Sequence, residues 1–376
     1  MKASFFNFSH DLALARNVAN YTPPRNVQIM ERDLASLVNL LPEAEMAYTE
    51  YAPVWGWDIS FVHRLKCSDL KSQLSLPHRS RGSLMSEPAS PTTDEPLATP
   101  LGLPTEEQLA DIRRLSSRLT AVEMLPAIRQ QLPEGSTVGE SYFDLTISQF
   151  DHLTSLQFDN FILKALYSGS GRGLRVVESR ESRVESLKDD VVIEPYYDKV
   201  ADFALEYLAT ATEVEFLGVS VFDTNANNGY LGNYIAPQRE LWQRIIKFVP
   251  HFDFEQLIGV VRDELRGRFV GHYLGPLGVD MMVVKVGEGL FVHPCVEVNV
   301  RRTMGELSLH MLPLLAEGAE GFFRIIFDKD SAALHQTVAA MPPAVCDDNG
   351  RLVSGTMLLT PLTADTHYVA VISSVA

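Results

Sequence analysis

The residues with the clearest chemical potential lie between positions 278 and 301, in the stretch GVDMMVVKVGEGLFVHPCVEVNVR. The runs Val279–Val286 and Leu290–Val300 are rich in Val, Met and Phe, which is typical of paired strands. Gly287-Glu288-Gly289 between them has the composition of a tight turn. The pattern therefore predicts a β-hairpin whose acidic and amide side chains share one face, because strand side chains alternate between faces.

The register of this hairpin decides whether its carboxylates meet. A two-residue turn at Glu288-Gly289 sets Asp280 opposite Glu297, with Cβ atoms about 4.5–5.5 Å apart. The same face then also carries Asn299 and Arg301. Carboxylate oxygens suit Mg²⁺, which proteins usually hold with one or two carboxylates plus substrate phosphates. A three-residue turn or a bulge at Pro294 would shift the pairing and separate the two carboxylates. An exposed hairpin with a solvated polar face is the alternative interpretation of the same stretch.

A glycine-rich loop follows a strand that carries a lysine, in the stretch FILKALYSGSGRGLRVV at 161–177. The strand is Phe161–Leu166 with Lys164, and the loop is Ser168–Gly173. A second strand, Leu174–Glu178, follows instead of a helix, so the loop is neither a Walker loop nor a dinucleotide-binding turn. The pattern favours a lid in which glycine N–H groups and Lys164 approach phosphates and exclude water. An ordinary glycine-rich hairpin loop has the same pattern.

Composition sets the class of protein. The chain has 376 residues, which predicts two or three domains, and its apolar and charged fractions, 46% and 21%, are those of a globular protein. The net charge of −16 argues against nucleic acid as a main partner. No apolar run reaches the roughly 18 residues of a membrane span, and the N-terminus does not resemble a signal peptide. Three widely spaced cysteines indicate neither a disulfide framework nor a zinc site. We therefore expect a cytoplasmic protein without a membrane partner.

The rest of the chain alternates strand-like and helix-like segments, which predicts an α/β protein. The expected strands, besides those above, are Ala3–Phe8, Glu45–Thr49, Val191–Tyr197, Phe203–Leu208, Glu215–Val221 and Tyr230–Ile235. The expected helices are Asp11–Ala19, Val27–Leu41, Thr105–Ser117, Arg180–Lys188, Arg239–Phe248, Asp253–Phe269 and Met304–Leu315. Residues 75–104 are dense in Ser, Pro and Thr, which is typical of a linker or loop.

The order of these motifs resembles the ATP-grasp family. The lysine strand, glycine loop and returning strand are followed by VVIEPYY at 191–197, GVDMMV at 278–283 and EVNVR at 297–301. The resemblance covers residues 118–315 and implies an α/β fold of two α+β lobes that bind ATP between them, preceded by a Rossmann-like domain. It implies an N-terminal Rossmann-like domain at 1–74, a linker or loop at 75–104, a lid subdomain at 105–190, a large subdomain at 191–330 and a C-terminal extension packed on the core at 331–376.

The resemblance also implies roles for individual residues. The Mg²⁺ ligands, with Mn²⁺ as an alternative ion, would be Asp280, Glu297 and Asn299. The ATP contacts would be Arg118, Lys164, Ser168, Gly169, Ser170, Gly171, Glu194, Pro195, Tyr196, Tyr197 and Asp202. Arg301 and Lys164 would act on the transferring phosphoryl group. Many members carry a second lysine where this chain has Arg118, which keeps the charge but changes the geometry of the contact.

The activity implied is that of an ATP-dependent ligase. Such enzymes convert ATP to ADP, activate a carboxylate as an acyl phosphate and form a carbon–nitrogen bond when an amine attacks it. The family suggests an amino acid or small peptide as substrate. A non-catalytic nucleotide-binding protein on the same scaffold, and an enzyme that stops at a phosphorylated product, remain alternatives.

Three polar residues near the N-terminus lie where the first expected strand meets a helix: Asn7, His10 and Asp11. Ligands of open α/β sheets bind at such strand ends, so these residues are candidates for substrate contacts. Helix capping by Ser9 or Asp11, with a solvated His10, explains the same pattern.

Overall fold

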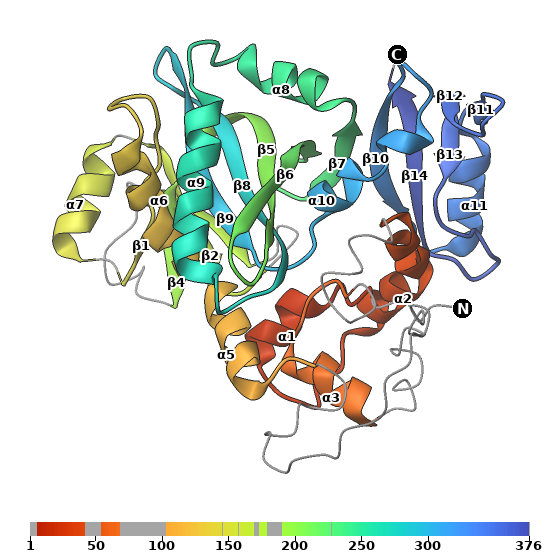
Figure 1. Ribbon diagram of the computed structural model, residues 1–376, viewed down its shortest axis with the longest axis horizontal. Coiled ribbons are helices and arrows are strands. Elements are labelled where there is room, and N and C mark those ends of the chain that lie inside the picture. Colours follow the sequence, from red (N-terminus) through yellow and green to blue (C-terminus); the bar gives the residue numbers. More distant parts are fainter. Residues whose placement is uncertain are drawn as a thin grey trace, which may run out of the picture.

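The computed structural model describes residues 6–41, 54–67, 103–144, 146–156, 158–168, 173–178, 190–226 and 228–375. Helices and antiparallel sheets make up this part of the chain (Figure 1), which confirms the predicted fold class of mixed α and β lobes. The strands are β1 (Tyr142–Phe143), β2 (Asn160–Ala165), β3 (Leu174–Glu178), β4 (Val191–Pro195), β5 (Asp198–Ala209), β6 (Val214–Thr224), β7 (Tyr230–Ile235), β8 (Gly275–Val286), β9 (Gly289–Asn299), β10 (Glu320–Phe327), β11 (Val345–Cys346), β12 (Leu352–Ser354), β13 (Thr356–Leu358) and β14 (Tyr368–Val375). The α-helices are α1 (His10–Arg16), α2 (Arg25–Leu34), α3 (Ile59–Cys67), α5 (Glu106–Leu115), α6 (Leu119–Gln131), α7 (Ile147–Ser155), α8 (Gln238–Ile246), α9 (Phe254–Phe269), α10 (Met304–Leu309) and α11 (Ser331–Ala339).

A small antiparallel sheet carries the predicted lysine strand. Among the described residues its order is β1-β4-β2-β3, with β2 paired to both β3 and β4. The strand β4, which ends at Pro195, therefore belongs to this sheet, and the small lobe extends past the boundary expected at residue 190. Residues 105–131 were expected in the lid subdomain. The helices α5 and α6, which they form, pack instead into the core of the large sheet.

The large sheet, in the described residues, has the order β13-β14-β10-β7-β6-β5-β8-β9. One face is covered by α8 and α9 (Figure 1). Alternation along β5 separates the two faces, since Phe203, Leu205 and Tyr207 are buried in that core. Asp202 and Glu206, of the opposite parity, face the small sheet across a cavity. The expected C-terminal extension is part of this sheet, because β14 pairs along β10.

The turn between β8 and β9 differs from the predicted one. Val286 pairs with Gly289, so the turn residues are Gly287-Glu288 and not Glu288-Gly289. Gly287 has a φ of +59° at the first central position, where type II′ hairpin turns favour glycine because other residues adopt positive φ at a cost.

A β-bulge restores the predicted pairing of the two carboxylates. Met282 pairs with His293, whereas Asp280 pairs with Glu297, so the step of two residues on β8 matches a step of four on β9. Pro294 lies in this irregular segment, where its missing N–H removes a donor from the ladder. The bulge, which the sequence led us to regard as a threat to the site, compensates for the displaced turn.

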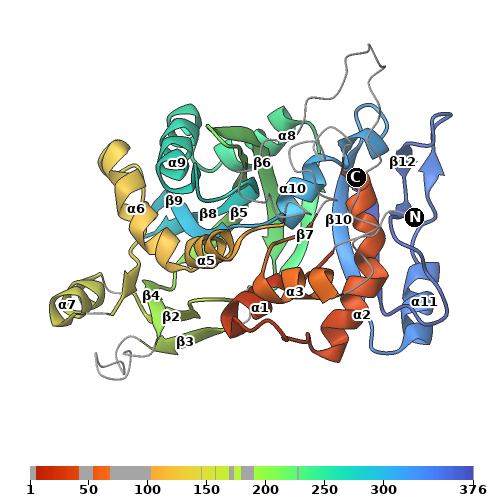
Figure 2. The same cartoon turned by 60° about the horizontal axis from the view of Figure 1, so that its bottom comes forward.

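The described part of the N-terminal segment contains helices joined by turns and irregular chain. The helices α1, α2 and α3 gather beside the large sheet (Figure 2), and α2 and the short 3₁₀ helix at Ala35–Leu40 bury Leu34 and Leu37 in a core shared with β10 and β14. Phe6 to Phe8, at the end of the first expected strand, are not extended strand. The second expected strand, Glu45–Thr49, lies outside the described residues. The same holds for residues 75–102 of the linker expected at 75–104.

Two other helices bear on the predictions. The helix α5 begins with the predicted cap, since the Thr105 side chain accepts a hydrogen bond from the backbone N–H of Gln108. The helix α10 ends at Leu309, earlier than predicted, and a 3₁₀ turn at Leu312–Leu314 follows, because Pro313 lacks the N–H that helix continuation requires. The helix expected at Arg180–Lys188 lies outside the described residues. No helix in the described ranges is long and apolar enough to cross a membrane.

Candidate functional site

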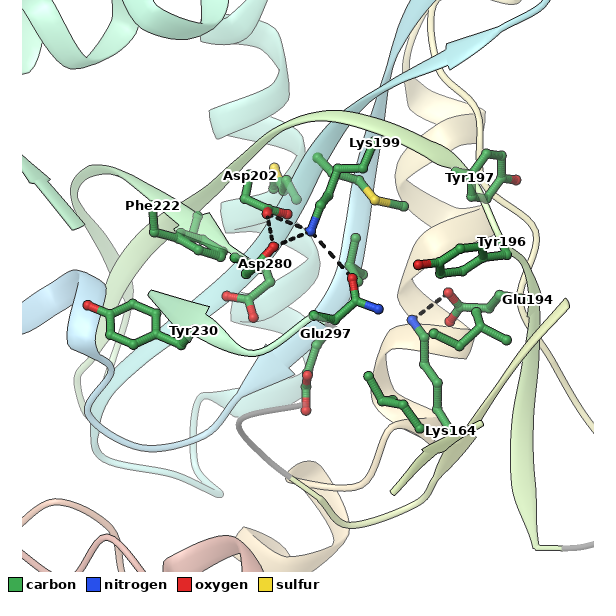
Figure 3. A pocket seen from close by; sticks show the side chains of 18 of the residues that line it. Lys164, Glu194, Tyr196, Tyr197, Lys199, Asp202, Phe222, Tyr230, Asp280 and Glu297 are labelled. Carbon is green, nitrogen blue, oxygen red and sulfur yellow. Dashed lines mark hydrogen bonds and ion pairs between the residues drawn. The ribbon is translucent and has the colours of Figure 1, made fainter. Parts of the chain in front are cut away.

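A cavity of about 1070 Å³ lies between the small sheet and the large sheet. Its walls come from β2 and β4 on one side and from β5, β6, β8 and β9 on the other (Figure 3). The predicted site residues that line it are Arg118, Lys164, Glu194, Pro195, Tyr196, Tyr197, Asp202, Asp280, Glu297, Asn299 and Arg301. Segments that are distant in sequence therefore meet at one cavity.

The small-lobe wall is built around a buried ion pair. Lys164 Nζ lies 2.5 Å from Glu194 Oε2, and the two residues are 5% and 3% exposed. The register of β2 and β4 explains the meeting, because Ile162 pairs with Glu194 and places Lys164 close by on the neighbouring strand. Ser141 donates a further hydrogen bond to Glu194 Oε1 at 3.0 Å. The lysine expected to contact phosphate is thus held by the carboxylate expected at the adenine hinge.

Arg118 connects the start of the glycine loop with the hairpin. Its Nε donates to the carbonyl of Ala165 at 2.9 Å, and its Nη2 donates to Ser168 Oγ at 3.0 Å. Its Nη1 lies 3.0 Å from Glu297 Oε2. The other residues predicted for the lid, Gly169, Ser170 and Gly171, lie outside the described residues.

The two hairpin carboxylates face one another as predicted. The pKa of Asp280 is raised to about 7, mainly by burial. The negative charge of Glu297 raises this pKa further, and a hydrogen bond with Asn299 lowers it. Two carboxylates and an amide are hard oxygen donors of the kind that Mg²⁺ accepts, and a cation there would compensate the charge that burial and Glu297 make unfavourable on Asp280. The donor set therefore fits a divalent cation. Within the described residues no three His, Cys, Asp or Glu side chains form a preformed metal cluster.

Arg301 lines the cavity but is engaged with the N-terminal segment. Its Nε and Nη2 donate to the two carboxylate oxygens of Asp11, each at 3.0 Å. Burial alone would raise the pKa of Asp11, but the guanidinium outweighs it and the pKa lies below its ordinary value. Such bidentate pairs are geometrically specific, so Asp11 orients the guanidinium that was expected to face a phosphoryl group.

Asn7 and His10 hold the N-terminal segment together. Asn7 donates to the carbonyl of Gly56 at 2.6 Å, and His10 Nδ1 lies 3.6 Å from Asp58 Oδ2. Both side chains are buried, and neither is among the cavity-lining residues. A Cβ at Gly56 would lie 2.6 Å from the His10 ring, so the glycine allows this close packing. Asp11 does not line the cavity either, but it contacts Arg301, which does, whereas Asn7 and His10 have a packing role.

Several lining residues were not singled out in the sequence. Lys199 Nζ lies 2.7 Å from Asp202 Oδ2, and it also contacts Thr224, which donates to Asp202 at 2.8 Å. Burial is the main cause that raises the pKa of Asp202, the expected ribose ligand. The others include Glu206, Ser220 and Phe222. Side chains along a strand alternate between faces, so Asp202 predicts that Glu206 points to the same side. The register shift between Lys199 and Ala201 breaks this alternation, so it could not place Lys199.

The comparisons with known proteins found structural likeness only. No family model and no curated relative matches the chain. The chain is similar in structure to N5-carboxyaminoimidazole synthetase from Staphylococcus aureus complexed with ADP (TM-score 0.41, 14% identity, 69% of this chain and 68% of that chain). It is also similar to carboxyaminoimidazole ribonucleotide synthase from Aspergillus clavatus complexed with ATP (TM-score 0.43, 16% identity, 71% and 70%). A biotin carboxylase from Campylobacter jejuni gives a TM-score of 0.41 at 12% identity, over 70% of this chain and 64% of that one.

The chain's own architecture agrees with the resemblance drawn from its motifs. Two antiparallel lobes face one cavity, the lysine strand and the VVIEPYY strand pair in the smaller lobe, and the carboxylate hairpin belongs to the larger one. This is the arrangement that the resemblance of the motifs to the ATP-grasp family implies.

Proposed function

We propose that this protein is an ATP-dependent ligase that activates a carboxylate and joins it to an amine. One observation carries the proposal: both lobes supply charged side chains to a single cavity of about 1070 Å³. The small lobe supplies Lys164 and the large lobe supplies Asp280 and Glu297. Small-molecule pockets typically measure about 300–1,000 Å³, so this cavity has room for a nucleotide and for further substrate atoms.

The residues of the cavity suit phosphoryl transfer, which depends on positioning and charge stabilisation more than on covalent chemistry by the protein. Pro195, Tyr196 and Tyr197 form the wall next to Lys164 and would hold adenine. Lys164 would stabilise negative charge on the phosphates. Asp280, Glu297 and Asn299 would hold Mg²⁺, which when bound supplies positive charge to phosphate oxygens.

The reaction proposed has two steps. An oxygen of the substrate carboxylate forms a bond to the γ-phosphorus of ATP, and the bond from that phosphorus to the ADP oxygen breaks. The amine nitrogen then attacks the acyl carbon, phosphate leaves with the electrons of its C–O bond, and the amine loses a proton. The cavity lies between the two lobes, and exclusion of water from it would protect the acyl phosphate from hydrolysis.

A second candidate, a nucleotide-binding protein without turnover, is favoured by one observation. Lys164, Arg118 and Arg301 are all engaged with protein carboxylates. A protein in which these pairs persist when ATP binds would lack free positive charge for the transferring group. Release of ADP, measured with candidate substrates, separates the two functions.

Thermal stability with nucleotides tests the binding half of the proposal. A ligand that binds only the folded state adds about 2.7 kcal/mol at 100 times its dissociation constant, so we expect millimolar Mg·ATP to raise Tm clearly. Mg²⁺ alone and Mg·GTP serve as controls and should give smaller shifts. Absence of any shift with Mg·ATP would remove the proposed function.

A further inference from the structure

Glu206 occupies a position in the cavity that the proposed reaction has not used. Along β5 the residues Asp202, Ala204 and Glu206 face the cavity in turn, and Ala204 pairs with Asp280. Glu206 pairs with Gly278, so it lies two residues, or roughly 7 Å, beyond the carboxylate site and away from the hinge. Nucleotide bound at the hinge with its phosphates at Asp280 would leave this end of the cavity for the other substrates.

The chain makes room for the Glu206 carboxylate with two glycines. A Cβ at Gly278 would lie 2.7 Å from Glu206 Oε2, and a Cβ at Gly305 would lie 2.0 Å from Oε1. Both distances are too short for any other residue without displacement. Two hydroxyls then fix the carboxylate, because Ser220 donates to Oε1 at 2.9 Å and Thr303 donates to Oε2 at 2.8 Å.

No cation in the described part of the chain neutralises this carboxylate. Glu206 is 0% exposed, and among the described residues no Lys, Arg or His forms an ion pair with it. The charged groups facing it are Asp280 and Glu306, both acidic, and Glu306 is already paired with Arg302. Burial is the main cause that raises the pKa of Glu206, to about 8, and those two charges add to it. A buried carboxyl group with hydroxyl partners alone lacks the partner that best compensates its charge, which is a cation.

We propose that Glu206, fixed by Ser220 and Thr303 at the end of the cavity remote from the hinge, binds the amino group of the substrate that attacks the acyl phosphate. The proposal rests on the ligase function and names the class of its acceptor, a compound with a primary amine. A competing explanation is purely structural: Thr303 caps α10 by accepting from Glu306 N–H at 2.8 Å, and Glu206 would only hold that cap in place.

The test uses the full chain and measures ADP release with Mg·ATP. The probes are the common amino acids, singly and in pairs, each compared with its N-acetyl derivative. We expect at least one free amine to stimulate ADP release and its acetylated form to be inactive. In Glu206→Gln, the KM for that amine should rise at least tenfold while the KM for ATP stays within twofold, because a neutral amide removes the charge and keeps the shape. The matched control is Glu213→Gln, in the exposed turn between β5 and β6.

Each outcome decides one part of the proposal. An unchanged amine KM in Glu206→Gln, or equal losses for all substrates together with a lower Tm, would overturn the amine contact and favour the structural role. Ser220→Ala keeps the charge, so it should change the amine KM less than Glu206→Gln does, and the reverse order would also overturn it. Bound Mg·ATP with no response to any amine would refute the acceptor class alone. Failure of the wild-type protein to bind Mg·ATP would refute the ligase function itself.

Discussion

Replacement of Asp280 by asparagine is expected to lower Mg²⁺-dependent ATP turnover by at least about 100-fold, because it removes one of two carboxylates that would hold the metal ion. Glu297→Gln should have a similar effect, since the two residues are paired across β8 and β9. The measurement is ADP release with saturating Mg·ATP. Glu288→Gln, in the turn of the same hairpin, is the control. Full turnover in both variants would remove the metal assignment.

The same substitution should stabilise the protein when Mg²⁺ is absent. The pKa of Asp280 is raised to about 7, so the folded state holds this proton more tightly than the unfolded state. Its unfavourable contribution is therefore absent at low pH, grows as pH rises from about 4 to about 7, and is complete above that range. We expect Asp280→Asn to gain about 1–2 kcal/mol at pH 8, after allowance for solvent screening of a side chain that lines a cavity, and nothing at pH 4.

Urea titrations at several pH values in a chelator would show this gain. A variant that loses turnover and gains stability at high pH has lost a functional carboxylate and not a structural one. Equal stability of the wild type and Asp280→Asn across the pH range would show that burial and Glu297 do not make the charge of Asp280 unfavourable in the folded state.

The hairpin shows what the sequence reveals and what it conceals. Composition was sufficient to place both strands, and alternation put the carboxylates on one face. The turn was wrong because two glycines flank Glu288 and either two-residue turn satisfies the local pattern. The correct pairing of Asp280 with Glu297 depends on a bulge near Pro294, and periodicity within one strand carries no information about bulges in its partner.

Contacts between distant segments account for the residues that the sequence could not assign. Asp11 and Arg301 are 290 positions apart, and no local pattern links them. Alternation could place Glu206 on the cavity face, but not its surroundings, which depend on glycines on β8 and α10 whose missing side chains leave it space. The sequence could not predict that Lys164 pairs with Glu194 or that Arg118 pairs with Glu297. Such pairs depend on which charged side chains the folded lobes bring together.

The second large effect concerns Lys164. In Lys164→Met the Glu194 carboxylate, 3% exposed, loses its ion-pair partner. Removal of one member of a buried pair costs about 3–5 kcal/mol, and we expect a loss of that size in the free energy of unfolding. Restoring neutrality with Lys164→Met/Glu194→Gln should recover most of this loss, because two neutral groups of similar shape carry no uncompensated charge.

ATP affinity separates the structural role of Lys164 from a functional one. If Lys164 contacts phosphate, the double variant should regain stability and still bind Mg·ATP at least about tenfold more weakly than the wild type, since a cation–phosphate contact contributes about 1.5–3 kcal/mol. Lys329→Met, at an exposed position, should change neither quantity. Isothermal titration of Mg·ATP into the three variants gives the comparison. Recovery of affinity together with stability would show that the lysine serves only to pair Glu194, and the phosphate contact would have to come from Arg118 or Lys199 instead.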